Sequence, residues 1–310
     1  FGATAKVDDV VEAFKAFLPR DTRNGMKKEV DEWREEAARK ATMEAGKKSH
    51  VDEGTVASAS PSSFSWPAAS CALVMIDWQK DFCHPDGFGA SLGNDVSLLN
   101  AAIPAAKRIL AAARAASMPV IHTLEAHLPD LSDCPPSKMR RCDSIGKIIA
   151  AADDEGGGTG DGAGAGGGVE GGSKGINIKG GGGGRNNNGR VLIRGEPGNA
   201  LIDELTDVPG EKVVYKPGKG AFYNTDLDAH LKSLGVTHLI FTGVTTEVCV
   251  QTTMREANDR GYECVLVEDA TESYFPEFKK ATLAMITAQN AIVGWTAKAD
   301  DVVAAMKKQQ

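Results

Sequence analysis

Three side chains of chemically useful types each follow a short apolar segment of the chain. Asp77 comes directly after the run Cys71–Ile76, Lys216 comes directly after Val213–Tyr215, and Cys249 follows a further apolar run and a short loop. A lone aspartate is usually a cap or an ion-pair partner, and a lone cysteine is more often a small buried apolar side chain. Together they indicate a shared cleft, because the carboxyl ends of neighbouring parallel strands lie at one edge of a sheet.

A thiol, a carboxylate and an ammonium group in one cleft are suited to nucleophilic catalysis. A free thiol has a pKa of about 8.5, and a helix N-terminus or an adjacent ammonium group lowers it, so we expect Cys249 to be a thiolate nucleophile. Asp77 can accept the thiol proton and return it to a departing amine, while Lys216 holds both partners in place. The backbone N–H groups of Thr245 and Cys249 are predicted to bind the oxyanion.

The elements that position these residues alternate between strand and helix from Cys71 onward. Such alternation predicts an α/β fold, a three-layer αβα architecture with a six-stranded, mainly parallel sheet of the Rossmann-like kind. The predicted strands are Cys71–Ile76, Pro119–Ile121, Val213–Tyr215, His238–Thr242, Cys264–Val267 and Ala291–Val293. The predicted helices cover approximately Val96–Ala115, Asp226–Leu234, Val248–Arg260 and Pro276–Gln289.

Composition limits the classes of partner. The chain has 310 residues, 42% of them hydrophobic and 25% charged, and its net charge of −7 argues against a nucleic-acid partner. We see no apolar run of the roughly 18 residues that a membrane helix needs, so no membrane partner is expected. The six cysteines form no C-x-x-C pair, which favours a reducing, cytoplasmic setting. The sequence starts at Phe1, which leaves an organellar targeting segment open.

Four segments resemble, in the same order, the motifs of the isochorismatase-like cysteine hydrolases. They are Val74–Asp77 with Gln79 and Asp81-Phe82, Tyr215–Phe222 with Thr225 and Leu227, Thr242–Thr253, and Asp269-Ala270. Three further segments are most similar in sequence to the biuret and ureide amidohydrolases of that family, namely Gly87–Gly89, Arg194–Gly198 and Met254–Arg260.

The resemblance implies roles for individual residues. The family's catalytic lysine lies six residues before the Phe of the small-Ala-Phe tripeptide, which assigns Lys216 to the triad and gives Lys219 a substrate-facing role. Phe82 would form a wall of the pocket, and Lys219 and Gln289 would bind the carbonyl and N–H groups of the substrate. Phe82 as a core residue and Gln289 as an exposed helix residue remain equally good interpretations. The resemblance also implies a cis peptide bond at Val244–Thr245 and a homo-oligomer.

No metal or other cofactor is expected. The nicotinamidases of the family carry Asp-x-His followed by a further histidine, whereas this chain has Glu125-Ala-His127 with no second histidine in range. We therefore interpret His122 and His127 as structural or pocket-wall residues.

Three parts of the chain are distinguished. Residues 1–66 are predicted to be a helical N-terminal extension that ends in a linker over residues 57–67. Residues 67–300 are predicted to form the hydrolase domain. Residues 155–190, which hold 18 of the chain's 35 glycines, are predicted to be a disordered insertion within that domain.

The predicted function is cysteine-dependent hydrolysis of a C–N bond in a small ureide or carboxamide of the biuret kind, through a thioester on Cys249 with release of ammonia. One alternative is the hydrolysis of an isochorismate-like vinyl ether, which uses the aspartate as an acid and needs no thiol. The other is a catalytically inactive interaction module of the same fold.

Overall fold

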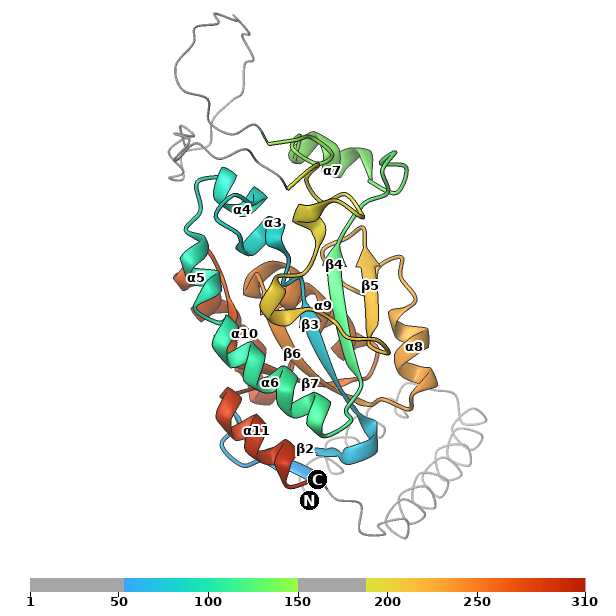
Figure 1. The fold of residues 1–310 in the computed structure, drawn as a ribbon. Helices are drawn as coiled ribbons and strands as arrows, with labels where there is room; N and C mark the ends of the chain where they lie inside the picture. Colours follow the sequence, from blue (N-terminus) through green and yellow to red (C-terminus); the bar gives the residue numbers. More distant parts are fainter. Residues whose placement is uncertain (1–52, 150–187, 310) are drawn as a thin grey trace, which may run out of the picture. The chain divides into compact units, whose positions relative to one another are not determined.

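Six parallel strands form the central sheet of the protein, seen in a computed structural model that describes residues 53–149 and 188–309 (Figure 1). The strand order is β5-β4-β3-β6-β7-β8. The strands are β3 (Cys71–Ile76), β4 (Val120–Glu125), β5 (Lys212–Lys216), β6 (His238–Val244), β7 (Glu263–Glu272) and β8 (Trp295–Ala297). The predicted αβα fold class is thus confirmed.

Both faces of the sheet are covered, because every side chain of β3 is buried. Alternate residues of a strand point to opposite faces. Cys71, Leu73 and Met75 therefore belong to one apolar cluster, and Ala72, Val74 and Ile76 belong to another. A strand buried on both faces has a continuous apolar sequence, which is why this segment is recognisable from its composition.

The helices divide between these two clusters. Residues of α5, α6 and α11 join the first cluster, whereas residues of α8, α9 and α10 join the second. In α6, the buried residues Ala106, Ile109, Leu110 and Ala113 follow the spacing of one helix face. The helices are α3 (Lys80–Cys83), α4 (Phe88–Ser91), α5 (Val96–Asn100), α6 (Ile103–Ala115), α7 (Pro136–Arg141), α8 (Leu227–Ser233), α9 (Gln251–Asp259), α10 (Pro276–Ala291) and α11 (Ala299–Lys307). Short 3-10 turns occur at Ala68–Ser70, Pro197–Asn199 and Asp203–Leu205, and a π turn, η4, occurs at Thr246–Val250.

The strand order reverses at β3, which places a ligand site at its carboxyl end. The chain runs outward from β3 through β4 to β5 and then returns to β6 on the other side of β3. Ligands of open α/β sheets bind at such a switch point, outside the carboxyl ends of the strands.

The prediction that residues 57–67 form a linker is wrong. β1 (Glu53–Val56) and β2 (Phe64–Pro67) pair as an antiparallel hairpin. Val56, Phe64 and Trp66 are buried in the first apolar cluster, together with residues of α11. The stretch between the strands is rich in Ser, Ala and Pro and therefore resembles a linker. The two apolar residues that follow it, Phe64 and Trp66, are too few to indicate a strand. The described fold thus begins before residue 67 and continues beyond residue 300.

Two element boundaries also differ from expectation. The sixth strand is Trp295–Ala297 rather than Ala291–Val293. Gln289, Asn290 and Ala291 have left-handed φ angles of 51°, 63° and 64°, so the chain turns there before it enters the strand. The helix predicted over Val96–Ala115 is divided into α5 and α6.

The stretch Val96–Ala115 is long and apolar enough for a membrane span by length and composition. Half of it is buried inside the fold, as in a helix that packs on a sheet, so it is weak support for a membrane segment. The helices predicted for the N-terminal extension lie outside the described residues, as does the predicted glycine-rich insertion up to position 187. At the end of that insertion, Arg190 forms an antiparallel bridge with Ile148.

Candidate active site

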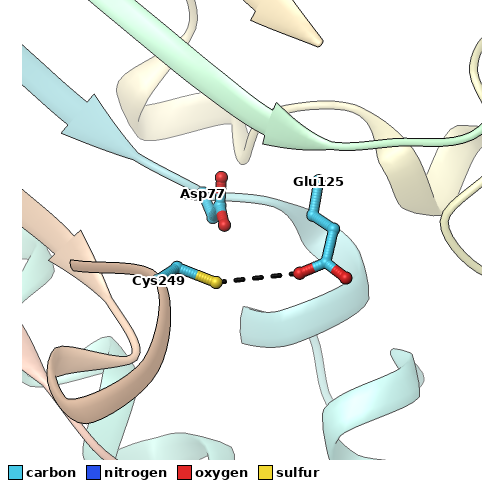
Figure 2. Close-up of side chains that lie close together, drawn as sticks. All are labelled: Asp77, Glu125 and Cys249. Carbon is cyan, nitrogen blue, oxygen red and sulfur yellow. Dashed lines mark hydrogen bonds between the residues drawn. The ribbon is translucent and has the colours of Figure 1, made fainter. Parts of the chain in front are cut away.

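Four polar residues meet at the carboxyl edge of the sheet. Asp77 directly follows β3, Glu125 ends β4, Lys216 ends β5, and Cys249 lies in the π turn after β6. Glu125 and Lys216 are direct partners in the pairing of β4 with β5. The strand register thus positions the site, and Figure 2 shows three of these side chains pointing toward one another.

Asp77 and Lys216 form a fully buried ion pair, with Nζ of Lys216 located 2.7 Å from Oδ2 of Asp77. The Thr123 hydroxyl donates to the other oxygen, Oδ1, at 2.6 Å. Lys216 also donates to the carbonyl of Gly218 at 3.1 Å. Among the described residues, Oδ2 has no donor other than Nζ of Lys216, so it can accept a further proton. Burial acts to lower the pKa of Lys216, but the carboxylates of Asp77 and Glu125 outweigh it and raise that pKa above its usual value.

Glu125 is the centre of the cluster, although its sequence context indicated only a position in a possible metal site. Its side chain is fully buried. Oε1 lies 2.7 Å from Nζ of Lys138 and 2.8 Å from Nζ of Lys219, and Nζ of Lys216 lies 3.9 Å from Oε2. Burial acts to raise the pKa of Glu125, but the three lysines lower it from 4.5 to about 2. Glu125 is therefore ionised at neutral pH.

The backbone of Glu125 is held as firmly as its side chain. Its N–H donates to Oε1 of Gln79 at 2.8 Å, and its carbonyl accepts from Nε2 of Gln79 and from Nδ2 of Asn199. Gln79 belongs to the first motif of the sequence analysis, so that motif positions the carboxylate on the neighbouring strand.

The Cys249 thiol is buried and contacts Glu125. Its Sγ donates to Oε2 of Glu125 at 3.7 Å (Figure 2). Burial raises the pKa of this thiol well above its usual value, and the charges of Asp77 and Glu125 add to burial, against Lys216 and Lys219. Burial and the two carboxylates therefore favour the protonated thiol in the free protein, against the ammonium groups on which the expected thiolate depends, and that thiolate stays a prediction. The thiol must give up its proton as it reacts.

The π turn that carries the nucleophile differs from the regular helix predicted to begin at Val248. It spans Thr246–Val250 and continues as α9 from Gln251, so Cys249 lies just before the N-terminus of α9. Such turns occur frequently at functional sites. The bond between Val244 and Thr245 is cis, as the resemblance implied. The oxyanion role of the N–H groups of Thr245 and Cys249 stays a prediction.

The predicted substrate-binding residues are only partly brought together. Lys219 lies in the cluster with its side chain 49% exposed. Phe82 lies on α3, directly beyond the carboxyl end of β3, and packs partly buried against two apolar clusters. Gln289 is exposed and lies six residues before β8, on the approach to the amino end of that strand. The prediction that Gln289 lines the pocket is therefore wrong for this chain, because α10 carries it away from the catalytic edge.

Three contributing residues were missed, and two of them have a sequence signal. The strand predicted as Pro119–Ile121 continues to Glu125, so extending it would have placed a carboxylate at its end by the rule that identified Asp77. The same extension includes Thr123. Lys138 lies on α7, in a connection with no regular alternation, and nothing in its neighbourhood indicates a site.

A metal ion fits this cluster poorly. One ligand atom from each of Asp77, Glu125 and Cys249 lies within 4.8 Å of the others. However, the ammonium groups of Lys216 and Lys138 already contact the two carboxylates at 2.7 Å. A divalent cation at this position would face those positive charges at close range.

Comparison with known proteins identifies relatives of this chain. Residues 71–157 and 177–298 match the model of the isochorismatase domain. A ureidoacrylate amidohydrolase RutB from Methylobacterium radiotolerans is 32% identical over 243 residues, which cover 78% of this chain and 81% of the relative. Its counterpart from Yersinia enterocolitica is 31% identical over 241 residues, which cover 77% of this chain and 90% of the relative.

Solved structures show the same fold at lower identity. A cysteine hydrolase from Pseudomonas syringae pv. phaseolicola is 21% identical with a TM-score of 0.58, over 79% of this chain and 97% of the other. An isochorismatase family protein from Desulfovibrio vulgaris is 24% identical with a TM-score of 0.54, over 76% of this chain and 98% of the other. The domain match spans more than half of this chain, and the chain belongs to the isochorismatase family.

Proposed function

We propose that the protein hydrolyses a C–N bond of a small ureide through a thioester on Cys249. The observation that carries this proposal is the buried contact of the Cys249 thiol with Glu125, beside the Asp77–Lys216 ion pair. The names of the curated relatives, ureidoacrylate amidohydrolases, support a ureide as substrate. Biuret-like ureides are the second candidate substrates, because several short segments of the sequence resemble those of biuret and ureide amidohydrolases.

The proposed reaction begins with proton transfer. As Sγ of Cys249 attacks the carbonyl carbon of the ureide, its proton passes to Asp77, whose Oδ2 keeps a lone pair. The carbonyl oxygen becomes an oxyanion, which in this proposal the backbone N–H groups of Thr245 and Cys249 bind. When the C–N bond breaks, the departing nitrogen takes the proton from Asp77.

The second half-reaction restores the enzyme. Water attacks the thioester carbon and gives a proton to Asp77, and the C–S bond breaks as Sγ regains that proton. Lys216 stays protonated throughout and holds the Asp77 carboxylate in place. Cleavage on either side of a ureide carbonyl yields ammonia, directly or when the released carbamic acid decomposes.

The two alternatives differ in what they require of the thiol. Hydrolysis of a vinyl ether needs an acid but no nucleophilic sulfur, and an inactive module needs neither. The burial of Cys249 against two charged groups is a costly arrangement for a side chain without a chemical role.

An ammonia-release assay tests the proposal. Its substrates are biuret, triuret, ureidoacrylate, nicotinamide and N-carbamoyl amino acids. Cys249→Ala should abolish ureide turnover, and rapid quenching of the wild type should give an acyl adduct on the Cys249 peptide by mass spectrometry. The matched control is Cys142→Ser, which changes a half-buried cysteine outside the cluster and should leave turnover unchanged. Wild-type activity on nicotinamide alone, or ureide turnover by Cys249→Ala, would refute the proposal.

A further inference from the structure

Lys138 reaches the catalytic cluster from outside the sheet, and no step of the proposed reaction uses it. It lies on α7, beyond the carboxyl end of β4 (Figure 1). Its Nζ lies 2.7 Å from Oε1 of Glu125, and it donates to the carbonyl of Pro217 at 2.7 Å and to Nε2 of His127 at 2.8 Å. An ammonium group has three donors, and these three acceptors match them, so Lys138 has no N–H left for a substrate.

The acceptors of Lys138 belong to the ends of two paired strands. Glu125 ends β4, and His127 follows it by two residues. Pro217 comes directly after Lys216, which ends β5. Lys138 therefore bridges the two strand ends that supply Glu125 and Lys216 to the site. Its side chain is only 12% exposed, so salt screens these contacts little.

His127 is held in the orientation that accepts from Lys138. Because an ammonium group only donates, Nε2 of His127 accepts, and the proton of the neutral ring lies on Nδ1. Nδ1 lies 3.3 Å from Oδ1 of Asp133, and the backbone N–H of His127 donates to the carbonyl of Leu192 at 2.7 Å. The ring is thus a fixed acceptor, and the position of the Lys138 ammonium group is set by three separate segments.

Glu125 divides its two oxygens between Lys138 and the nucleophile. Oε1 faces Nζ of Lys138, whereas Oε2 accepts from Sγ of Cys249 at 3.7 Å. The terminal torsion of a glutamate has only broad preferences, so a partner must fix the plane of the carboxylate. Lys219 donates to both oxygens, but its side chain is 49% exposed. The buried partner, Lys138, is therefore the one that sets the direction of Oε2.

We propose that Lys138 is a positioning residue of the reaction, whose ammonium group holds the Glu125 carboxylate with Oε2 against Sγ of Cys249. This inference rests on the proposed function and adds to it a residue from outside the sheet. Because Lys138 acts through Glu125 and has no donor for the substrate, its removal should slow the chemical step and leave substrate binding nearly unchanged.

Chemical rescue of Lys138→Ala tests the inference. The substitution should lower kcat about tenfold to a hundredfold, as a displaced catalytic contact does, while KM changes by less than about threefold. Propylammonium supplies the atoms that alanine lacks, so it should restore kcat at least about fivefold, with a saturating dependence on its concentration. Tetramethylammonium carries the same charge without an N–H donor and should restore nothing. Substrate consumption is followed by chromatography, because an added amine disturbs the detection of ammonia.

The matched control is Lys147→Ala, which removes an exposed lysine of the same connection and should change neither kcat nor its response to propylammonium. If melting curves show that Lys138→Ala does not fold, Lys138→Met keeps the apolar length of the side chain, and the split between kcat and KM carries the test.

Three results for a folded Lys138→Ala variant would overturn the inference. They are a kcat within about twofold of the wild type, a loss that appears in KM alone, and a loss of kcat that propylammonium does not restore better than tetramethylammonium. Failure of the proposed function looks different, because the wild type itself would then consume no ureide.

Discussion

Oε2 of Glu125 accepts a hydrogen bond from Sγ of Cys249 at 3.7 Å, while Oε1 of the same carboxylate contacts two lysines. Glu125 thus joins the nucleophile to the positive charges of the site. It lies on β4, which pairs with the strands that supply Asp77 and Lys216. The arrangement makes Glu125 a fourth member of the cluster, beside the three residues expected from the sequence.

Replacing Glu125 by glutamine tests this role. The amide keeps the shape of the carboxylate but loses its charge, so three buried or half-buried ammonium groups would face Asp77 alone. We expect kcat/KM to fall by about a hundredfold or more. Removing one partner from a buried ion pair costs about 3–5 kcal/mol, so the melting temperature should fall as well.

Glu211→Gln is the control for stability. Glu211 is a well-buried carboxylate that accepts hydrogen bonds from Arg114 and His122, and it lies directly before the amino end of β5. Its replacement should lower the melting temperature without changing kcat. An equal loss of kcat in both variants would show that Glu125 acts through general stability alone.

The pH dependence of stability follows from the same pKa shifts. Glu125 has its pKa lowered from 4.5 to about 2, so its contribution is present above its unfolded pKa and is lost as pH falls toward 2. Lys216 has a raised pKa, so its contribution is present below its unfolded value, about 10.4, and is lost as pH rises further. These two groups therefore add little pH dependence to the melting temperature between about pH 5 and pH 10. Burial lowers the pKa values of His122 and His127, so the melting temperature should fall as pH decreases below about 6.5. In Glu125→Gln, the melting temperature should decrease less steeply as pH falls below about 5. An unchanged decrease would contradict the assignment of a lowered pKa to Glu125.

Thr123 is expected to orient Asp77. Its hydroxyl donates to Oδ1 at 2.6 Å, and valine would keep the shape while removing that donor. We expect Thr123→Val to lower kcat about tenfold to 150-fold, since a hydrogen bond to a charged group contributes about 1.5–3 kcal/mol. The control is Thr282→Val, whose buried hydroxyl has no hydrogen-bond partner among the described residues. That change should preserve kcat, and the same result for Thr123→Val would exclude an orienting role.

Much of the site was predictable because it lies at strand ends. A parallel strand buried on both faces has an apolar run that ends abruptly, and the next polar residue then lies at the catalytic edge. This rule places Asp77 at the edge. Lys216 ends β5, an edge strand with an exposed Tyr215, and there only the end of the short apolar run Val213–Tyr215 indicated its position. Glu125 was not predicted at this edge because β4 contains His122 and Thr123. Their polar side chains interrupt the apolar run, although both are buried.

Other features depend on contacts that no local pattern records. Lys138 reaches the site from α7, and its partners on Glu125, Pro217 and His127 come from separate segments. The protonation state of Cys249 depends on the balance between burial and four neighbouring charges, which requires the assembled structure.

The position of Gln289 gives a prediction opposite to the one made from the sequence. The side chain is exposed near the amino end of β8, away from Asp77 and Cys249 at the carboxyl edge. An exposed residue without buried contacts usually changes stability by less than about 0.5 kcal/mol when replaced. Gln289→Leu should therefore leave kcat/KM within about twofold for every ureide. A tenfold loss of kcat/KM for ureides alone would instead show that Gln289 contacts the substrate.

The reactivity of the cysteines provides the last prediction. Cys249 is 4% exposed and its thiol has a raised pKa, whereas Cys142 is half-buried. Because the thiolate is the reactive form, iodoacetamide should label Cys142 first near neutral pH without loss of activity. Labelling of Cys249 should be slow, should accelerate as pH rises above 9, and should parallel inactivation. Peptide mass spectrometry along the inactivation time course measures both rates, and Cys142→Ser removes the fast phase. Inactivation that follows Cys142 while Cys249 stays unmodified would show that the nucleophile has been assigned to the wrong cysteine.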